Sequence, residues 1–217
     1  VCASSKPNGA DATVEAIRAL GRNAWAVHAD LADRDALEWM VRDTLDMAGP
    51  IDILVNNGGS IARHPAIEFP MDEWDRVLHT NLDAVFFLCQ RFGRSMITRG
   101  AGKIINVASL LSFSGGITVP AYTASKHAVA GVTKALANEW AKHNVQVNAI
   151  APGYFATDNT QRLRDDPRRF EEISARIPAG RWGEPSDLAG AVVFLASPAS
   201  NYMNGHVLVV DGGWMAR

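Results

Sequence analysis

The sequence has few cysteines, no long apolar run and no excess of charge, and each absence argues against a class of protein. Its only cysteines are Cys2 and Cys89, which lack a CxxC spacing, and its six histidines show no ligand spacing, so we expect no disulfide scaffold and no metal site. A reducing, cytoplasmic location fits this cysteine usage. No run of about 18 apolar residues occurs, so no membrane span is expected. Lysine and arginine total 21 against 23 aspartate and glutamate, which gives no basic surface for nucleic acid.

The composition instead favours one buried core. With 217 residues, 47% of them hydrophobic, the chain is expected to form a single domain over residues 1–217. Its first residues, Val1-Cys2-Ala3, have no signal-peptide pattern and are typical of the end of a strand. We therefore expect that an N-terminal piece is missing from this sequence.

Short apolar runs bounded by turn residues alternate with longer segments of helical periodicity. The predicted strands are 24–29, 51–55, 103–107, 145–150 and 206–210. The predicted helices are 11–20, 33–47, 73–98, 122–140 and 185–196. Because alternating strands and helices imply parallel pairing, the sequence predicts a doubly wound parallel sheet with helices on both faces, a Rossmann-like α/β fold.

Polar residues and glycines follow successive predicted strands. They are Asp30, Asn56 to Gly59, Ser109 and Pro152-Gly153. For any one of these segments an ordinary polar turn is a sufficient explanation. Since the carboxyl ends of parallel strands line one crevice, however, four such segments together predict a ligand site there.

Tyr122 and Lys126 lie four residues apart on the predicted helix 122–140, and therefore on one helix face. A free phenol has a pKa near ~10, too high for efficient proton transfer at neutral pH. An ammonium about 4 Å away, at an effective dielectric near 20, is worth roughly 4 kcal/mol and would lower the phenol pKa by up to about three units. Such a pair also arises by chance, so it predicts a catalytic site only in combination with the crevice residues.

These motifs together resemble the short-chain dehydrogenase/reductase family over essentially the whole chain. The resemblance is carried by Asn56-Asn57-Gly58-Gly59, Asn81 in HTNLDAVF, Ser109 with twelve residues before Tyr122-x-x-x-Lys126, PGYFAT and the closing VDGG. It implies that Tyr122 exchanges the substrate proton, that Lys126 lowers its pKa and holds the nicotinamide ribose, that Ser109 polarises the carbonyl, and that Asn81 supports Lys126 through water. It further implies a cofactor, NAD(H) or NADP(H), bound by Asp30, Leu31, Asn57, Gly58, Gly59, Tyr122, Lys126, Pro152, Gly153 and Thr157.

The sequence departs from the family pattern in two places. Gly58 occupies a position that is usually alanine, and the glycine-rich phosphate-binding turn TGxxxGxG after the first strand is absent. The absence of this turn implies that a first strand, turn and helix of about 30 to 40 residues are missing from the sequence. We therefore expect an exposed strand edge and weak cofactor binding. No acidic residue follows Val1-Cys2-Ala3, and Ser4, Ser5 and Lys6 could accept a 2'-phosphate, so the choice of NAD or NADP stays open.

A closer resemblance, to the sugar-acid dehydrogenases of this family, is carried by GKIINVASLLSFSGG, VNAIAPGYFATDNT and VDGGWMAR. It implies hydride transfer at C5 of a deoxy-keto sugar acid and a homotetramer built on helices 122–140 and 83–98. Arg63, Arg162 and Arg164 are candidate anchors for the substrate carboxylate, whereas Arg181 in PAGRWG is better explained by a structural ion pair. Two alternatives stay open: reduction of 3-oxoacyl groups or other ketones, and a catalytically silent fragment or oligomerisation partner.

Overall fold

The computed structural model describes residues 1–217 as an α/β fold in which all strand pairs are parallel. The strands are β1 (Cys2–Ser4), β2 (Ala26–His28), β3 (Ile53–Asn56), β4 (Gly102–Val107), β5 (Val145–Pro152) and β6 (Val207–Val210). The helices are α1 (Asp11–Ala19), α2 (Arg34–Ala48), α3 (Met71–Leu78), α4 (Ala84–Arg99), α5 (Pro120–Trp140), α6 (Gln161–Arg164), α7 (Pro167–Arg176) and α8 (Ala189–Ala196). The predicted Rossmann-like class is confirmed.

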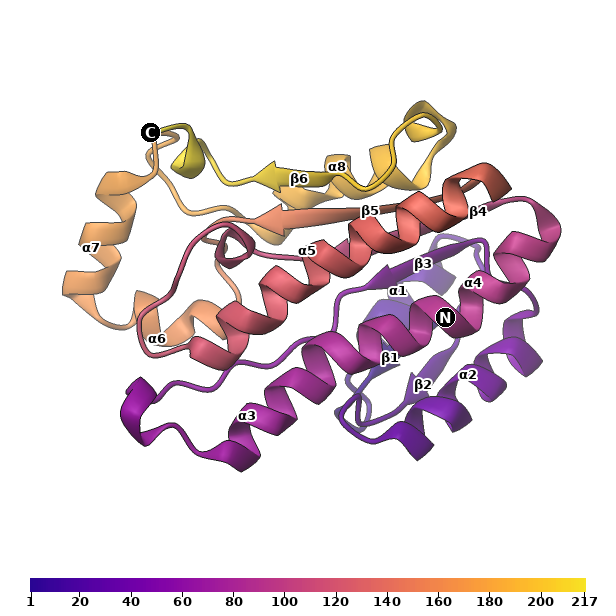
Figure 1. Ribbon diagram of the computed structural model, residues 1–217, viewed down its shortest axis with the longest axis horizontal. Helices are drawn as coiled ribbons and strands as arrows, with labels where there is room; N and C mark the ends of the chain where they lie inside the picture. Colours follow the sequence, from indigo (N-terminus) through magenta and orange to yellow (C-terminus); the bar gives the residue numbers. More distant parts are fainter.

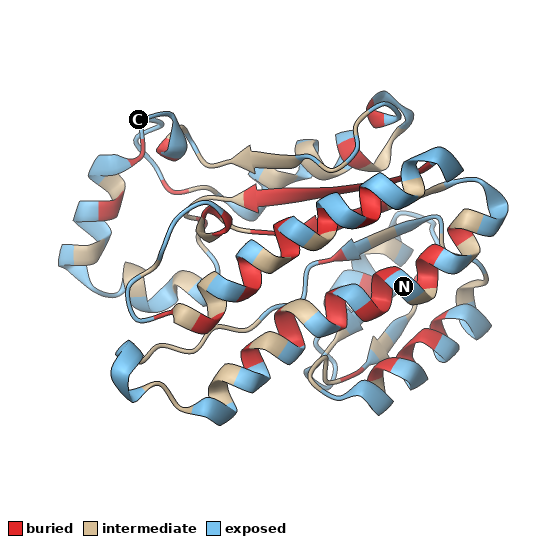
Figure 2. Cartoon of the chain, in the orientation of Figure 1, coloured by how far each residue is buried: buried red, intermediate tan, exposed pale blue.

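Helices cover both faces of the larger sheet. Figure 1 shows α4 and α5 side by side in front of the strands, with α8 fainter behind them. Figure 2 shows β5 buried along almost its whole length between these layers. The stripe predicted as core on helix 122–140 faces inward, since Val129 and Leu136 are buried in the main apolar cluster. None of the helices combines the length and the apolarity needed to cross a bilayer.

The strands form two sheets rather than the single one predicted. β1 pairs only with β2, while β3, β4, β5 and β6 follow one another in a four-stranded sheet. No hydrogen bonds join β1 to β3, and a groove of about 950 Å³ runs past both strands. Ile53 and Val55 on β3 are 45% and 42% exposed. The predicted exposed strand edge is therefore present, and it belongs to β3.

The helix predicted over residues 73–98 is interrupted. α3 passes into a π-helical turn, His79–Asp83, before α4 begins. Such a turn carries one extra residue, which no apolar periodicity encodes, and π-helical turns often occur at functional sites. This one contains Asn81, which is fully buried.

Candidate active site

Ser109, Tyr122 and Lys126 meet where β4 ends and α5 begins. Ser109 lies two residues past β4, and its Oγ accepts a hydrogen bond from the backbone N–H of Leu111 at 3.2 Å. Pro120 occupies the first position of α5, which favours helix initiation there and places Tyr122 in the first turn. Lys126 lies one turn further along and is only 4% exposed. The sequence thus brings a hydroxyl, a phenol and an ammonium to one corner of the crevice.

The electrostatics of this corner differ from the prediction. The pKa of Tyr122 is raised, because burial disfavours the phenolate more than hydrogen bonding by Ser109 and the charge of Arg63 favour it. The Nζ atom of Lys126 lies 5.5 Å from the ring centre of Tyr122 and donates to the Val107 carbonyl at 2.6 Å. Burial also lowers the pKa of Lys126 to about 8. The predicted lowering of the phenol pKa by the lysine is therefore wrong for this arrangement.

The Asn81 side chain holds the turn that follows β3. Its Oδ1 accepts from the backbone N–H of Ser60 at 2.8 Å, and its Nδ2 donates to the Ser60 carbonyl at 2.9 Å and to Ser125 Oγ at 3.1 Å. The side chain therefore contacts the glycine turn and α5 rather than Lys126. The π-helical turn carries this fully buried amide, whose contacts are the Ser60 backbone and the Ser125 hydroxyl.

Most residues predicted to bind a cofactor line the groove. These are Asp30, Leu31, Asn57, Gly58, Gly59 and Thr157. The remaining predicted contacts do not line it: Tyr122 and Lys126 lie on α5, while Pro152 and Gly153 lie at the end of β5. A Cβ on Gly153 would come within 2.7 Å of the Cα of Asp211, so glycine there allows β5 and the residue after β6 to approach closely.

Unpaired polar atoms and a close backbone approach at the groove fit a polar, planar ligand. Asn56 Oδ1 and Ser60 Oγ are buried and have no hydrogen-bond partner within the chain. A Cβ on Gly59 would lie 3.4 Å from Asn81 Oδ1 and 3.9 Å from the Nζ of Lys126. Glycine therefore keeps the space beside the lysine open. The residues present thus fit a dinucleotide, whose ribose hydroxyls need such partners.

Arg63 lies close enough to Tyr122 for its charge to act on the phenol. Its Nη2 donates to the backbone carbonyl of Asn159 at 3.1 Å, which joins the segment after β3 to the turn before α6. Burial and the charge of Arg162 lower the pKa of Arg63, while Tyr122 opposes this shift. Neither Arg63 nor Arg162 has a carboxylate within 4.0 Å. Arg63 therefore lies close to both the phenol and a second cation, and neither arginine has a carboxylate partner.

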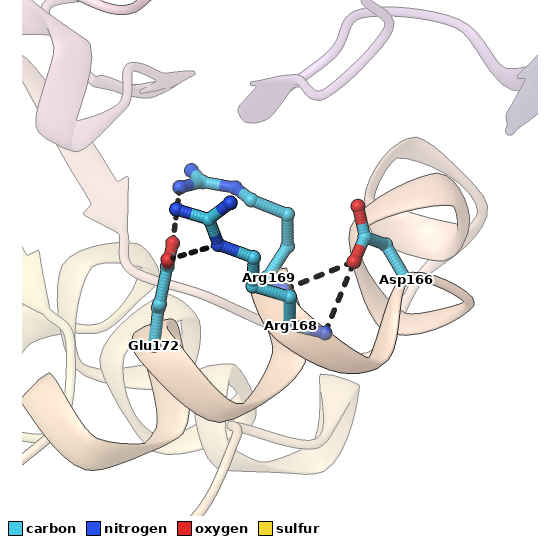
Figure 3. Close-up of polar contacts among 4 residues, drawn as sticks. All are labelled: Asp166, Arg168, Arg169 and Glu172. Carbon is cyan, nitrogen blue, oxygen red and sulfur yellow. Dashed lines mark hydrogen bonds and ion pairs between the residues drawn. The ribbon is translucent and has the colours of Figure 1, made fainter.

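The other arginines of this region have local partners. Figure 3 shows Arg168 and Arg169 converging on Glu172, at 2.9 Å and 2.8 Å, while Asp166 caps α7 by accepting from both backbone N–H groups. Arg164 donates to the Thr157 carbonyl at 3.2 Å. Arg63 and Arg164 each donate to a backbone carbonyl, and the Nε of Arg164 is buried without a partner, so all three predicted anchors keep free donors and stay candidates.

The sequence analysis missed some residues that contribute to the site. Ser60, which follows Gly59 directly, is held by Asn81, and Arg76 on α3 forms an ion pair with Asp30 at 3.3 Å. The position of Ser60 next to the glycine turn was a usable signal. No sequence pattern relates Arg76 to Asp30, because the contact depends on how α3 packs beside the end of β2.

A parallel α/β fold with a large groove, and with a serine, a tyrosine and a lysine clustered beside the glycine turn that lines it, is typical of a nicotinamide-dependent oxidoreductase. A family model described as "Enoyl-(Acyl carrier protein) reductase" matches residues 1–215, and the chain belongs to the short-chain dehydrogenase/reductase family.

Several members of this family are strongly similar to this chain. The 2-dehydro-3-deoxy-D-gluconate 5-dehydrogenase of Escherichia coli (strain K12) is 56% identical over 206 residues, which are 94% of this chain and 81% of that protein. A crystal structure of a putative NAD(P)-dependent gluconate 5-dehydrogenase from Beutenbergia cavernae, with bound NADP at low occupancy, is 50% identical with a TM-score of 0.93 and covers 97% of this chain and 84% of that one. The crystal structure of a gluconate 5-dehydrogenase from Burkholderia cenocepacia J2315, in complex with NADP and tartrate, is 38% identical. Its TM-score is 0.94, and the match covers 100% of this chain and 85% of that one.

Proposed function

We propose that this protein is an NAD(P)-dependent dehydrogenase that interconverts a secondary alcohol and a ketone at C5 of a deoxy-keto sugar acid. The observation that carries the proposal is the meeting of Ser109, Tyr122 and Lys126 beside the glycine turn that lines the groove. The names of its relatives support the substrate class, since one acts on 2-dehydro-3-deoxy-D-gluconate at position 5.

In this proposal the residues handle one proton and one developing oxyanion. A bound nicotinamide supplies or accepts the hydride. Because burial raises its pKa, Tyr122 is protonated at neutral pH and is suited to donate a proton to the carbonyl oxygen during reduction. Ser109 orients that oxygen, and Arg63 favours the phenolate left behind. Lys126 donates toward the ribose, and Asn81 keeps the glycine turn in place.

The groove residues are proposed to hold the cofactor. Asp30 and Leu31 would meet the adenine, Asn57, Gly58 and Gly59 the adenosine ribose, and Pro152, Gly153 and Thr157 the nicotinamide end. Ser4, Ser5 and Lys6, at the end of β1 and just past it, offer donors to a 2'-phosphate, and two similar structures hold NADP. Relative activity with NAD and NADP tests which cofactor is preferred.

We further propose that Arg63 and Arg162 bind the substrate carboxylate. They lie close enough for the charge of one to affect the other, and neither has an acidic partner. A bound carboxylate would relieve their repulsion and accept bidentate hydrogen bonds. The binding of tartrate, a carboxylic acid, to a similar enzyme agrees with this chemistry.

The decisive experiment is an assay of a panel of ketones with the unaltered protein and with Tyr122→Phe. We expect turnover of sugar acids such as 5-keto-D-gluconate, and a loss of about 10²- to 10⁴-fold in kcat for Tyr122→Phe with cofactor affinity retained. Arg63→Gln and Arg162→Gln should raise KM for the acid but not for its uncharged amide, whereas Arg168→Gln should change neither. Full turnover by Tyr122→Phe would refute the mechanism.

A second candidate function is reduction of 3-oxoacyl groups. The matching family model supports it, because its description names a reductase of acyl groups. An acetoacetyl thioester in the same panel separates the two, because it carries no carboxylate for the arginines. A catalytically silent fragment or oligomerisation partner would neither bind dinucleotide nor turn over any ketone.

The proposal includes the setting of the enzyme: one domain over residues 1–217, a cytoplasmic location and a homotetramer. The exposed small-residue face of α5, formed by Ala124, Gly131 and Ala135, supports helix-to-helix packing between copies. A Cβ on Gly131 would meet nothing within 4 Å, so this face is open. A monomeric mass by light scattering would refute the tetramer.

A further inference from the structure

One end of the groove carries an ion pair that joins two separate elements. Arg76 lies on α3, and Asp30 follows β2, yet Nη2 of Arg76 lies 3.3 Å from Oδ2 of Asp30. Both side chains line the groove, together with Leu31 and Gly58. The pair therefore faces the same space that the cofactor is proposed to fill.

The ion pair fixes the orientation of the carboxylate. Oδ1 of Asp30 accepts from the backbone N–H of Ala32 at 3.0 Å, while Oδ2 meets the guanidinium. Each oxygen keeps a further lone pair, and Arg76 keeps N–H donors that no other residue uses. The hydrogen bond from Ala32 and the charge of Arg76 both lower the pKa of Asp30, which keeps it a charged acceptor.

An apolar surface lies beside this pair. A Cβ on Gly58 would come within 2.2 Å of Leu31 Cδ1, so the leucine packs directly over the glycine backbone. A planar ring can therefore lie against Leu31 while its edge meets Asp30 and Arg76. This arrangement explains how the chain accommodates Gly58 where the family usually has alanine.

We propose that Arg76 is a base-reading residue, which together with Asp30 presents an adjacent donor and acceptor to the edge of adenine. The adenine amino group donates and the neighbouring ring nitrogen accepts, so the two patterns are complementary. Hypoxanthine has a carbonyl oxygen in place of the amino group and would turn a lone pair toward the Asp30 carboxylate. The proposal rests on the proposed function, because it requires a nicotinamide dinucleotide in the groove.

The test compares the dissociation constants of NAD or NADP, whichever binds more tightly, and of its hypoxanthine counterpart, measured by calorimetry on the full chain. The unaltered protein should prefer the adenine form by about tenfold. Arg76→Gln should remove part of this preference by weakening binding of the adenine form alone, while the contact of Asp30 with the amino group remains. The matched control is Arg91→Gln, whose residue pairs with Glu38 between α4 and α2 and does not line the groove. This control should keep the full preference.

The outcomes separate this proposal from the function on which it rests. If the unaltered protein binds no dinucleotide, both fall. If it binds and Arg76→Gln keeps the tenfold preference, the ion pair is a surface feature only and this inference alone is overturned. An equal loss for both bases would also overturn base reading, because it would assign Arg76 a merely structural role. Thermal melting checks that Arg76→Gln folds like the control.

Discussion

At the scale of single residues, burial has the largest effect on the pKa values of Tyr122 and Lys126. Lys126 is 4% exposed, and its pKa falls to about 8. The sequence predicts which charges are close in the chain, but desolvation depends on what the rest of the fold places around them. For this reason the helical spacing of Tyr122 and Lys126 was predicted correctly, while the direction of the phenol shift was not.

The buried lysine makes stability depend on pH. Its folded-state pKa of about 8 lies below its ordinary value of 10.5, so between these values the unfolded chain binds the extra proton and stability rises with pH. Below pH 8 the folded protein carries the full cost of burying the protonated lysine, about 3 kcal/mol. Lys126→Met removes this cost and loses the hydrogen bond to Val107, so we expect it to be about 1 to 2 kcal/mol more stable at pH 7.

The measurement is chemical denaturation of both proteins at pH 7 and pH 10. The advantage of Lys126→Met should shrink toward zero at the higher pH, because the folded lysine is then neutral. The variant should also be inactive if the proposed function holds. Lower stability of Lys126→Met at pH 7 would contradict the sign of this prediction.

At the scale of elements, most strands and helices could be predicted from apolar periodicity and turn residues. The exceptions have local physical causes. The π-helical turn in residues 79–83 inserts a residue that propensities do not encode. α6 and α7 lie in a polar segment, and α7 depends on the Asp166 cap and on packing of Ile173. Arg181 was predicted to form a structural ion pair, and it meets Asp187 at 2.7 Å and 3.0 Å.

The C-terminal turn fixes α7 beside the proposed substrate mouth. The guanidinium of Arg176 lies 4.0 Å from the ring centre of Trp214, and Tyr154 packs against the same ring at 4.6 Å. Gly212 and Gly213 have φ of +64° and +91°, which side chains disfavour, and they turn the chain so that the tryptophan reaches α7. The closing glycine pair thus has a structural explanation.

Replacing this tryptophan should loosen α7 without touching the proposed catalytic residues. Trp214→Ala removes a large buried side chain, at a cost of about 3 to 5 kcal/mol. We expect faster amide exchange in residues 167–176 and a higher KM for the sugar acid, with a smaller change in kcat. Arg168→Gln, which alters an exposed ion pair on the same helix, is the control. Unchanged exchange in α7 would show that the turn does not hold this helix.

At the scale of the whole molecule, the open edge of β3 is the feature most open to improper association. Exposed apolar strand edges pair with other chains, and a lysine on the edge suppresses such pairing. Ile53→Lys should therefore slow concentration-dependent aggregation several-fold, followed by light scattering. Ile67→Lys is the matched control, since Ile67 is 93% exposed but lies in a short 3-10 turn. Equal aggregation of the two variants would exclude the β3 edge as the cause.

The division of the strands into two sheets also has a dynamic consequence. Residues 1–50 contact the rest of the molecule through side-chain packing of α2 against α4. No hydrogen bonds between strands join the two parts. Residues 1–50 should behave as a separate cooperative unit that opens at a lower free energy than the β4–β5 centre. A molecule that bridges the groove would tie this unit to the centre. Ligand occupancy would then be visible as slower hydrogen exchange in a region far from the reacting carbon.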